Sequence, residues 1–434
     1  MRKMNGWAVI GLTLMTAVMT GCSLKDSFSE PDPTTDPVEP GYSEPFGLTP
    51  AEQEMVNHSN EFAFNLFRQI IDSRKDDESL KNKSIIVSPI SITYALGMLN
   101  NGAAGNTQAQ INKVLGFGDT GAAGINAFCK KMLDSIPHLD SLTKVMIANN
   151  IYVNKNYVLK KDFTQTAKTY YSAYPETRDF HDGQTLGVIN EWASDHTEKM
   201  IEKVLDESSF NPDAVSYLLN AIYFKGQWTK KFNKAYTVQE EFRHSGNSTG
   251  VVMRPMMHQT TEYEYADIDG YQVLRLPYGN KSFQMTVLLP GIIDHDSQDV
   301  LSTVPLAETW SKINKKMSTV LVDLKLPRFE TGTDIDLTQI MSDLGMPDAF
   351  NSGNADFSKF CNTDTYIGLM KQVARIKLDE EGTEAAAVTV IGMKNTAVSE
   401  EPKMVYFYAN HPFLYVISEN STGAILFIGQ YTGY

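Results

Sequence analysis

The chain has 434 residues, of which 42% are apolar and 10% are aromatic, and this is enough apolar material for a large folded core. The formal net charge is −14 and no basic stretch is interleaved with aromatic residues, so the composition argues against nucleic-acid binding. Three cysteines, Cys22, Cys129 and Cys361, are too few for a disulfide framework. We expect Cys129 and Cys361 to be buried free thiols, with a single bridge between them as the alternative.

The N-terminus has the pattern of a secretory signal. Arg2 and Lys3 precede an apolar stretch from Trp7 to Met19, and Cys22 follows two small residues. The apolar stretch is too short for a membrane-spanning helix. The ending Met-Thr-Gly-Cys resembles a bacterial lipobox, and this resemblance implies cleavage before Cys22 and acylation of its thiol. An ordinary signal peptide or an uncleaved anchor is the alternative.

Residues 23–50 form a second compositional segment. Proline, serine, threonine and acidic residues dominate it, and its few apolar residues cannot bury enough surface to fold. We expect a disordered tether that lifts a globular domain off the membrane. From residue 51 to residue 434 the composition is globular, without a second linker or an internal repeat. The expected limits are therefore 1–22 for the signal, 23–50 for the tether and 51–434 for one large domain.

Helices and strands alternate along this domain. Apolar residues at helical spacing predict four helices, over residues 51–73, 91–101, 108–114 and 187–204. Alternating or β-branched runs predict strands over residues 142–153, 217–224, 271–276, 283–289, 320–326, 373–378, 404–408, 413–417 and 424–428. The two kinds of element mix without a strict βαβ rhythm, which predicts an α+β fold.

Residues 380–403 differ from the rest of the domain. They lie between two predicted strands and are too long for a hairpin turn. The first half is small and apolar, whereas the second half is polar and ends in Glu400, Glu401 and Pro402. At a period of two, one face carries small side chains that grow larger along the segment.

Such a face can slide between existing strands. A loop that becomes a central strand gains two hydrogen-bond ladders, and at roughly 0.5–1.5 kcal/mol net per bond a dozen inserted residues release on the order of 10 kcal/mol. An exposed loop with a flanking alanine-rich helix is the alternative. The residues alone leave both interpretations open.

Short motifs occur through the domain in a fixed order. They are Ser88-Pro89, Ser91, Ala95-Leu96, Gly102-Ala103, Asn106-Thr107, Asn190, Trp192, Thr197, Asn220, Phe224-Lys225-Gly226, Trp228, Phe232, Leu326-Pro327-Arg328-Phe329, Leu344-Gly345-Met346, Ala355-Asp356-Phe357 and the run from Phe407 to Ile417. Together with the segment from Glu380 to Ala387, they closely resemble the serpin family of serine protease inhibitors. The resemblance covers roughly residues 51–434.

This resemblance implies a fold and a mechanism. The fold has three β-sheets, the large one called sheet A, surrounded by about nine helices, with an exposed reactive-centre loop. A protease cleaves the loop and forms a covalent acyl complex. The N-terminal half of the loop then inserts into sheet A and distorts the protease before deacylation; loop insertion releases stored strain. The implied partner is a serine protease, with elastase-, trypsin- and chymotrypsin-like enzymes and some cysteine proteases as possible targets.

The resemblance also assigns a hinge at the start of this loop. It comprises Glu380, Glu381, Gly382, Thr383, Glu384, Ala385, Ala386 and Ala387. Gly382 permits backbone angles that other residues resist, which suits a hinge. The small side chains that follow favour insertion, so the resemblance implies an inhibitor rather than a non-inhibitory binding lipoprotein, which is the alternative function.

A second group of residues is implied in the opening of sheet A. It comprises Ser88, Ser91, Asn220, Gln372 and Arg328. Arg328 and Glu380 correspond to a charge pair of the family. Gln372 stands where many members have a histidine, but it also donates and accepts hydrogen bonds, so a network with Ser91 and Asn220 remains expected. Sheet opening that depends on histidine protonation is not expected.

The family spacing places the cleaved bond between Thr396 and Ala397. Met393, Lys394 and Val398 are the alternatives, because the loop is longer than in many relatives. Met393 would suit a chymotrypsin-like protease, Lys394 a trypsin-like one, and Thr396 or Val398 an elastase-like one.

The sequence contains no recognisable motif for metal binding, nucleophilic catalysis or phosphate binding. The eight histidines form no HExxH pattern, and no GxSxG or phosphate-binding loop is present. His411 is interpreted as a packed residue of the family signature. We therefore expect no enzyme activity, no metal and no cofactor. The expected protein is a monomeric lipoprotein of a bacterial outer membrane, anchored through Cys22 and facing either the periplasm or the exterior.

Overall fold

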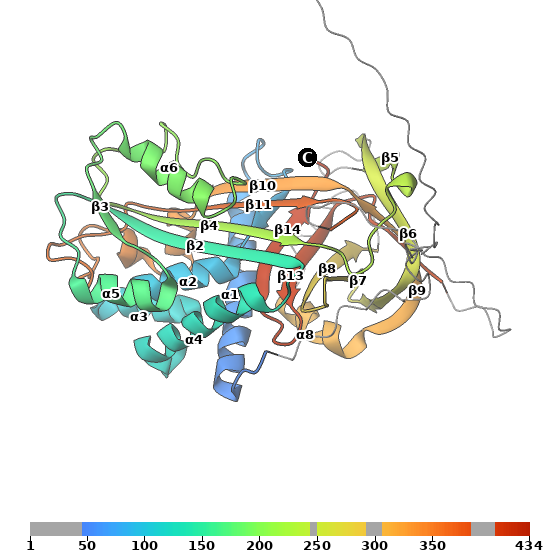
Figure 1. Ribbon diagram of the computed structural model, residues 1–434, viewed down its shortest axis with the longest axis horizontal. Helices are drawn as coiled ribbons and strands as arrows, with labels where there is room; N and C mark the ends of the chain where they lie inside the picture. Colours follow the sequence, from blue (N-terminus) through green and yellow to red (C-terminus); the bar gives the residue numbers. More distant parts are fainter. Residues whose placement is uncertain (1–45, 244–249, 292–305, 383–403) are drawn as a thin grey trace, which may run out of the picture. The chain divides into compact units, whose positions relative to one another are not determined.

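The computed structural model describes residues 46–243, 250–291, 306–382 and 404–434, all within one folded unit (Figure 1). The predicted signal and nearly all of the predicted tether, with Cys22, lie outside the described residues, so the domain limits remain predictions. Cys129 and Cys361 are both buried and free, as predicted. Among the described residues, no helix combines the length and the apolar character needed to cross a membrane.

The described residues contain eight α-helices, close to the number expected. They are α1 (Pro50–Arg74), α2 (Pro89–Asn100), α3 (Gly105–Leu115), α4 (Gly121–Ser135), α5 (Lys161–Tyr171), α6 (Thr185–Asp195), α8 (Leu306–Lys316) and α9 (Thr338–Asp343). At the start of α1, Thr49 Oγ1 accepts a hydrogen bond from the Glu52 amide, and the Glu52 carboxylate accepts one from the Thr49 amide. Pro50 occupies the first helical position, where no amide hydrogen is needed. This capping box explains why the helix begins at residue 50.

Nine strands form the first sheet. They are β1 (Ile85–Val87), β5 (Val238–Arg243), β6 (Val251–Ile268), β7 (Tyr271–Tyr278), β8 (Phe283–Pro290), β9 (Ser318–Pro327), β12 (Val405–Tyr408), β13 (Phe413–Glu419) and β14 (Ile425–Tyr431). The order is β1-β14-β13-β8-β7-β6-β9-β12, with β5 paired to β6. β6 has 18 residues; it pairs with β9 on one side, and with β5 and then β7 on the other.

Five strands form the second sheet. They are β2 (Thr143–Asn154), β3 (Glu176–Arg178), β4 (Ser216–Gly226), β10 (Phe329–Asp336) and β11 (Leu369–Leu378), in the order β10-β11-β4-β2-β3. The predicted α+β class is confirmed. The described strands nevertheless form two hydrogen-bonded networks rather than the expected three, because the long β6 joins two smaller sheets into one.

Helices cover both faces of the five-stranded sheet (Figure 1). Leu219 and Ala221 of β4 pack in a cluster with Ile189 of α6, whereas Leu218 and Ile222 belong to the main core, which also contains α2. The alternation follows from the period of two in a strand. All twelve residues of α2 are buried, and this helix packs against β2, β4 and β14.

The predicted helix over residues 187–204 is too long, because α6 ends at Asp195. Glu198 and Lys199 have positive φ angles of 50° and 65°, which no α-helix contains. Thr197 also diverts the backbone, since its Oγ1 donates to Ala193 O and accepts from the Ile201 amide. The apolar pattern continues past Asp195 because Ile201 and Val204 still pack against the sheet in an irregular segment.

Candidate functional site

The five-stranded sheet opens between β4 and β11. The two strands pair in parallel from Tyr217–Leu369 to Ile222–Ala374 and then separate, although β4 continues to Gly226 and β11 to Leu378. The outer partners do not separate, because β2 pairs with β4 up to Gly226 and β10 pairs with β11 up to Leu378. The described residues therefore leave the central pair of strands open at the end that leads into residues 379–382.

Segment 379–382, which contains the first three residues of the predicted hinge, Glu380 to Gly382, packs against residues 228–232. The amides of Trp228 and Phe232 donate to the carbonyl oxygens of Glu381 and Glu380, at 2.8 and 2.9 Å. The indole Nε1 of Trp228 donates to Asp379 O, and Trp228 stacks on Tyr278 with 4.4 Å between ring centroids. Residues 228–232, which we call the seat, thus form the surface that the hinge contacts.

Glu380 is buried at this seat, with 2% of its surface exposed. Its Oε1 accepts a 2.7 Å hydrogen bond from Thr237 Oγ1 and lies 3.4 Å from Nη1 of Arg328. The structure thus brings together the two charges that the family resemblance paired. Because Arg328 is half exposed, Thr237 is the better-shielded partner of this carboxylate.

Glu381 and Asp379 add two further carboxylates. Glu381 is also buried and lies 3.1 Å from Lys231 Nζ and 3.2 Å from Lys234 Nζ. Burial and the neighbouring Glu380 raise the pKa of Asp379, although its carboxylate accepts a hydrogen bond from the Glu381 amide. Two of these three consecutive acids, Glu380 and Glu381, are therefore held against basic residues from other parts of the chain.

Gly382 lies where the sheet opens. Its φ of +136° is a conformation that L side chains rarely adopt. A Cβ atom at this position would lie 2.1 Å from Gly226 O and 2.7 Å from the Trp228 amide nitrogen. Gly382 also pairs with Gln227 in an isolated bridge. Only glycine fits this close approach between the hinge and the end of β4.

A buried hydrogen-bond network lies beneath the paired part of β4 and β11. Gln372 and Asn220 are direct register partners, and Gln372 Nε2 donates to Asn220 Oδ1 at 2.6 Å. Gln372 Oε1 accepts from the Ser88 amide at 2.9 Å. Ser91 Oγ lies 2.8 Å from Asn220 Oδ1 and 3.0 Å from Gln372 Nε2. Since Ser88 precedes α2 and Ser91 lies in its first turn, this network ties that helix to the seam between the two strands.

The remaining predicted loop residues lie outside the described residues. These are Thr383, Glu384, Ala385, Ala386 and Ala387 of the hinge, and Met393, Lys394, Thr396, Ala397 and Val398 of the bait region. His411 is described and is packed as predicted: its Nε2 contacts Pro290 O at 3.0 Å, and burial lowers the pKa of its imidazole.

Sequence reasoning missed Thr237, Lys231 and Lys234 as partners of the hinge. The signal available was the excess of acids at residues 379–381, which requires compensating donors when these acids are buried. The sequence does not say which donors, because the partners lie some 140 residues earlier in the chain.

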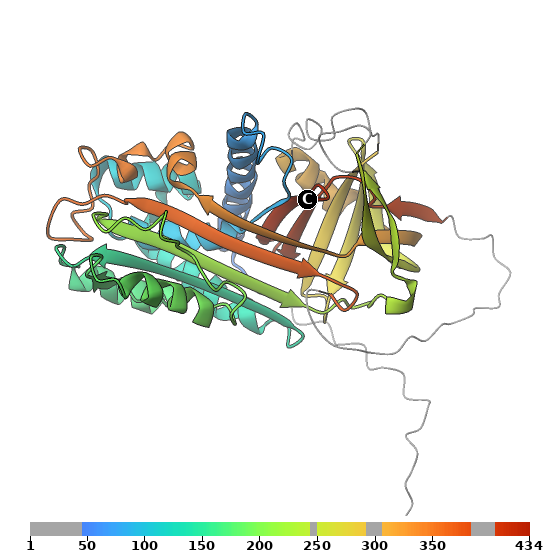
Figure 2. The ribbon, with the colours of Figure 1, turned by 90° about the horizontal axis from the view of Figure 1, so that it is seen from above.

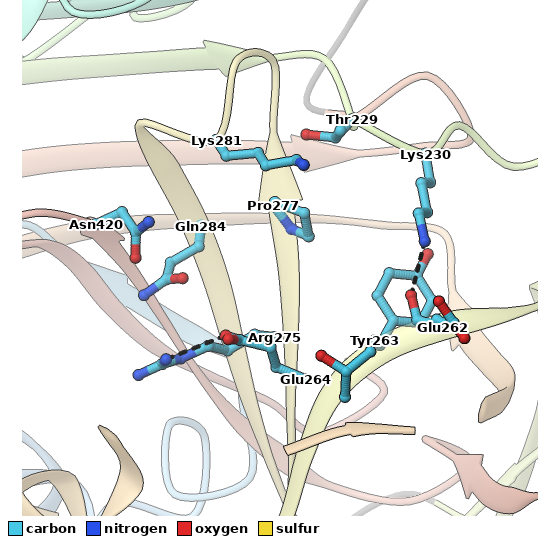
Figure 3. A pocket seen from close by; sticks show the side chains of 11 residues that line it. Thr229, Lys230, Glu262, Tyr263, Glu264, Arg275, Pro277, Lys281, Gln284 and Asn420 are labelled. Carbon is cyan, nitrogen blue, oxygen red and sulfur yellow. Dashed lines mark hydrogen bonds and ion pairs between the residues drawn. The ribbon is translucent and has the colours of Figure 1, made fainter. Parts of the chain in front are cut away.

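A separate pocket of about 480 Å³ lies on β6, β7 and β8 (Figure 3). Tyr263 and Pro277 contribute apolar surface, and Arg275 pairs with Glu264 at 3.2 Å. Lys230 points into the same pocket and donates to Glu262 O. None of the hinge or network residues above lines this pocket. In the part of the chain that the structure describes, no group of three His, Cys, Asp or Glu residues is arranged to hold a metal ion.

Comparison with known proteins identifies the family to which this chain belongs. The family Serpin, described as serine protease inhibitor, matches residues 57–433. The chain belongs to the serpin family. This serpin is 34% identical over 399 residues to Serpin B3 of Homo sapiens, an alignment that covers 86% of this chain and 98% of the relative. It is 32% identical over 390 residues to the leukocyte elastase inhibitor of Equus caballus, covering 88% and 99%.

A solved structure is similar over nearly the whole domain. The thermophilic serpin tengpin in its native state superimposes on this serpin with a TM-score of 0.79, at 28% sequence identity, covering 89% of this chain and 95% of tengpin. This likeness supports the assignment of the fold. It extends across both the five-stranded and the nine-stranded sheets, since so much of each chain is covered.

The prediction that the chain is not an enzyme is corrected. The finding that replaces it is membership of a family described as serine protease inhibitor, with a relative named as an elastase inhibitor. This finding is a statement about the family. We therefore describe the chain as a member of the serpin family and draw no conclusion about enzymatic activity.

Proposed function

We propose that this serpin inhibits serine proteases irreversibly, as a substrate that traps the enzyme during cleavage. The observation that carries the proposal is the opening between β4 and β11, which lies directly at Gly382. The opening offers a place for the segment that follows the hinge. The inhibitor named among the relatives supports the same class of target.

In the proposed reaction, the serine hydroxyl of the protease attacks the carbonyl carbon of the bait residue. The peptide bond breaks, the new amino terminus leaves, and an ester joins the protease to the bait residue. The bait bond is proposed to be Thr396–Ala397, with Met393, Lys394 and Val398 marking alternative positions. Elastase-, trypsin- and chymotrypsin-like enzymes are the proposed targets, and cysteine proteases are a further class.

Insertion must then outpace hydrolysis of the ester. Cleavage frees the segment after Gly382, which enters the opening and separates the six register pairs of β4 and β11. The insert forms hydrogen bonds on both of its sides, at about 0.5–1.5 kcal/mol net each. We propose that Thr383, Ala385 and Ala387 enter first and that their small size permits rapid entry.

The described residues have proposed roles in keeping the sheet closed before cleavage. Two buried acids hold the hinge on its seat: Glu380 contacts Arg328 and Thr237, and Glu381 contacts Lys231 and Lys234. The Gln372 network holds α2 against the seam. Removing either set is expected to loosen the sheet without touching the bait bond.

The deciding experiment mixes the mature protein with pancreatic elastase, trypsin and chymotrypsin and examines the products on a denaturing gel. A covalent complex that survives denaturation supports the proposal. Cleavage of the loop while every protease stays active would contradict it and would favour a non-inhibitory binding protein. A second arm uses Thr383→Arg, which is expected to turn the inhibitor into a substrate. Unchanged trapping by this variant would show that the hinge is misplaced.

For the location, we propose a bacterial outer-membrane lipoprotein anchored through Cys22 and monomeric in its folded part. The support is the N-terminal sequence pattern alone. Cys22→Ala is expected to release the protein from the membrane fraction. Protease treatment of intact cells distinguishes the two faces, since digestion indicates an outward and protection an inward orientation. Retention of Cys22→Ala in the membrane fraction would contradict lipid anchoring at this residue.

A further inference from the structure

The strand that follows the bait is short and lies at an edge of the nine-stranded sheet. β12 has four residues and pairs in parallel with β9, from Val405–Val322 to Tyr408–Lys325. Among the described residues, no strand pairs with its other side. Figure 2 shows the dark red β12 arrow at the end of the molecule where β11 finishes. Four parallel pairs are a weak hold, because parallel pairing is slightly less stable per residue than antiparallel pairing.

A carboxylate adds a second hold on β12. Tyr408 Oη donates a 2.7 Å hydrogen bond to Asp323 Oδ2 on β9. Asp323 Oδ1 lies 2.5 Å from His258 Nε2 on β6 and accepts a 3.3 Å hydrogen bond from Thr260 Oγ1. Side chains from three neighbouring strands therefore meet at one carboxylate, whose side chain is only 15% exposed. Neither Asp323 nor His258 belongs to the motifs that carry the family resemblance.

The charge states of the two partners favour this bond. Burial raises the pKa of Asp323, but its donors Tyr408, His258 and Thr260 together hold the pKa below its ordinary value, so the carboxylate is ionised. Burial and the bond to Asp323 raise the pKa of Tyr408 to about 12, so the phenol keeps its proton. A hydrogen bond from a neutral donor to a charged acceptor is stronger than one between two neutral groups.

The ring of Tyr408 has a separate contact. Lys325 Nζ of β9 lies 5.1 Å from the centroid of this ring, and 2.8 Å from the carboxylate of Glu240 on β5. A cation placed over an aromatic ring is attracted to its face. Tyr408 is thus held at its hydroxyl by Asp323 and at its ring by Lys325, which makes it the best-anchored side chain of β12.

Chain length shows why the hold on β12 matters to an uncleaved bait. A strand that fills the opening beside all ten residues of β11 spans about 33 Å and uses residues 383–392. The eleven residues 393–403 then span at most about 40 Å on the way back to β12. Release of β12 adds residues 404–408 to this return, or about 18 Å of chain. An uncleaved bait is therefore almost too short to enter while β12 is paired, and it has slack once β12 is released.

We propose that Asp323 is a positioning residue of the bait, which holds β12 through Tyr408 and so keeps the uncleaved bait outside the opening. This inference rests on the proposed inhibitory function. The contact acts on how long the uncleaved protein keeps its ability to trap a protease, which we call the trapping lifetime. It does not act on cleavage itself, so freshly folded protein should associate with a protease at the same rate with or without this contact.

The test compares Tyr408→Phe with a matched control, Tyr171→Phe. Tyr171 is the last residue of α5 and donates a 2.6 Å hydrogen bond to Asn126 Oδ1 on α4. Each variant loses one hydrogen-bonding phenol oxygen and keeps its ring, but only the first variant loosens β12. Asp323→Ala removes the acceptor of the same bond. Each mature protein is incubated at physiological temperature, and samples are taken over time for protease trapping, for chain integrity on a denaturing gel, and for amide exchange of residues 404–409.

Tyr408→Phe is expected to shorten the trapping lifetime of the intact chain about tenfold and to speed amide exchange of residues 404–409 by a similar factor, as for loss of a hydrogen bond to a charged group. Asp323→Ala is expected to do the same, and Tyr171→Phe is expected to match the wild type in both measurements. If Asp323→Ala does not fold, Tyr408→Phe decides alone.

A wild-type trapping lifetime for Tyr408→Phe would overturn the proposal, even where its amide exchange is faster. An equal shortening by Tyr171→Phe would also overturn it, because the effect would then reflect a general loss of stability. If the wild type traps no protease, the proposed function itself fails. If the wild type traps protease and Tyr408→Phe keeps its lifetime, only this inference fails.

Discussion

The most direct test of the hinge is Gly382→Ala. The substitution adds one methyl group at a φ of +136°, where non-glycine residues cost about 1–3 kcal/mol. The new Cβ would lie 2.1 Å from Gly226 O, and ordinary contact begins near 3.4 Å, so backbone must move by more than an ångström. Overpacking of this kind costs a further 1–3 kcal/mol or so. We therefore expect a native state destabilised by about 2–6 kcal/mol.

Thermal unfolding measures this effect. At about 2 °C per kcal/mol for a domain of this size, the midpoint falls by roughly 4–12 °C. Trp228 donates to Glu381 O and Asp379 O, so its fluorescence should report release of the hinge at lower temperature than in the wild type. Displacement of the hinge from its seat is also expected to raise the stoichiometry of inhibition, because more molecules open the sheet before a protease arrives.

Gly183→Ala is the control, since a Cβ at Gly183 meets nothing within 4 Å and this glycine has an ordinary φ. It should leave both the midpoint and the stoichiometry unchanged. The reasoning is refuted if Gly382→Ala unfolds within about 1 °C of the wild type and traps protease equally well. That result would mean that the backbone of the hinge and the end of β4 adjust freely.

Three further predictions concern groups around the seam. Gln372→His places an imidazole in a fully buried network, where burial lowers its pKa below the ordinary 6.5. As pH falls through about 6.5, the variant should therefore lose more stability than the wild type in the same melting series, because the buried His411 contributes equally to both proteins. Parallel losses of the two proteins would contradict this expectation. Thr237→Val removes the 2.7 Å hydrogen bond to the buried Glu380 and should lower the free energy of unfolding, measured by chemical denaturation, by about 1.5–3 kcal/mol. The control Thr260→Val should lower it by less, because its partner Asp323 has other donors. Equal losses for the two variants would contradict a special role for Thr237. Asp379→Asn removes a carboxyl group whose pKa is raised by burial, and such a group stabilises the native state at low pH but not as the pH rises. The variant should therefore melt at or above the wild-type temperature at pH 7 and lose that advantage near pH 3. A lower melting midpoint at pH 7 would show that the negative charge is needed.

Much of the fold could be predicted from short-range patterns. The strands that became β2, β4, β8, β13 and β14 are long apolar or alternating runs, and their burial follows that pattern. β6 was not predicted, because Pro255, charged residues and polar residues interrupt its apolar pattern. It exists because neighbouring strands supply hydrogen bonds on both of its sides, and this is tertiary information.

The candidate site was predictable to the extent that it is carried by local motifs. Gly382, the pair of Glu380 with Arg328, and the network around Gln372 were all expected from the family resemblance, and the structure brings each set together. Thr237 could not be predicted in this way. Nothing in its sequence surroundings marks it, and it reaches Glu380 only because β4 delivers the following segment to the end of β11.

The parallel pairing of β4 with β11 has a consequence for direction. A segment that turns back at Gly382 travels opposite to β11, and β11 and β4 run the same way. An inserted strand would therefore be antiparallel to both neighbours, and six parallel pairs would be exchanged for two antiparallel ladders, the pairing that is slightly more stable per residue. Had β4 and β11 been antiparallel, an inserted strand would be antiparallel to one neighbour and parallel to the other. The topology of the sheet thus biases the molecule toward filling its own seam, independently of which side chains line the bait.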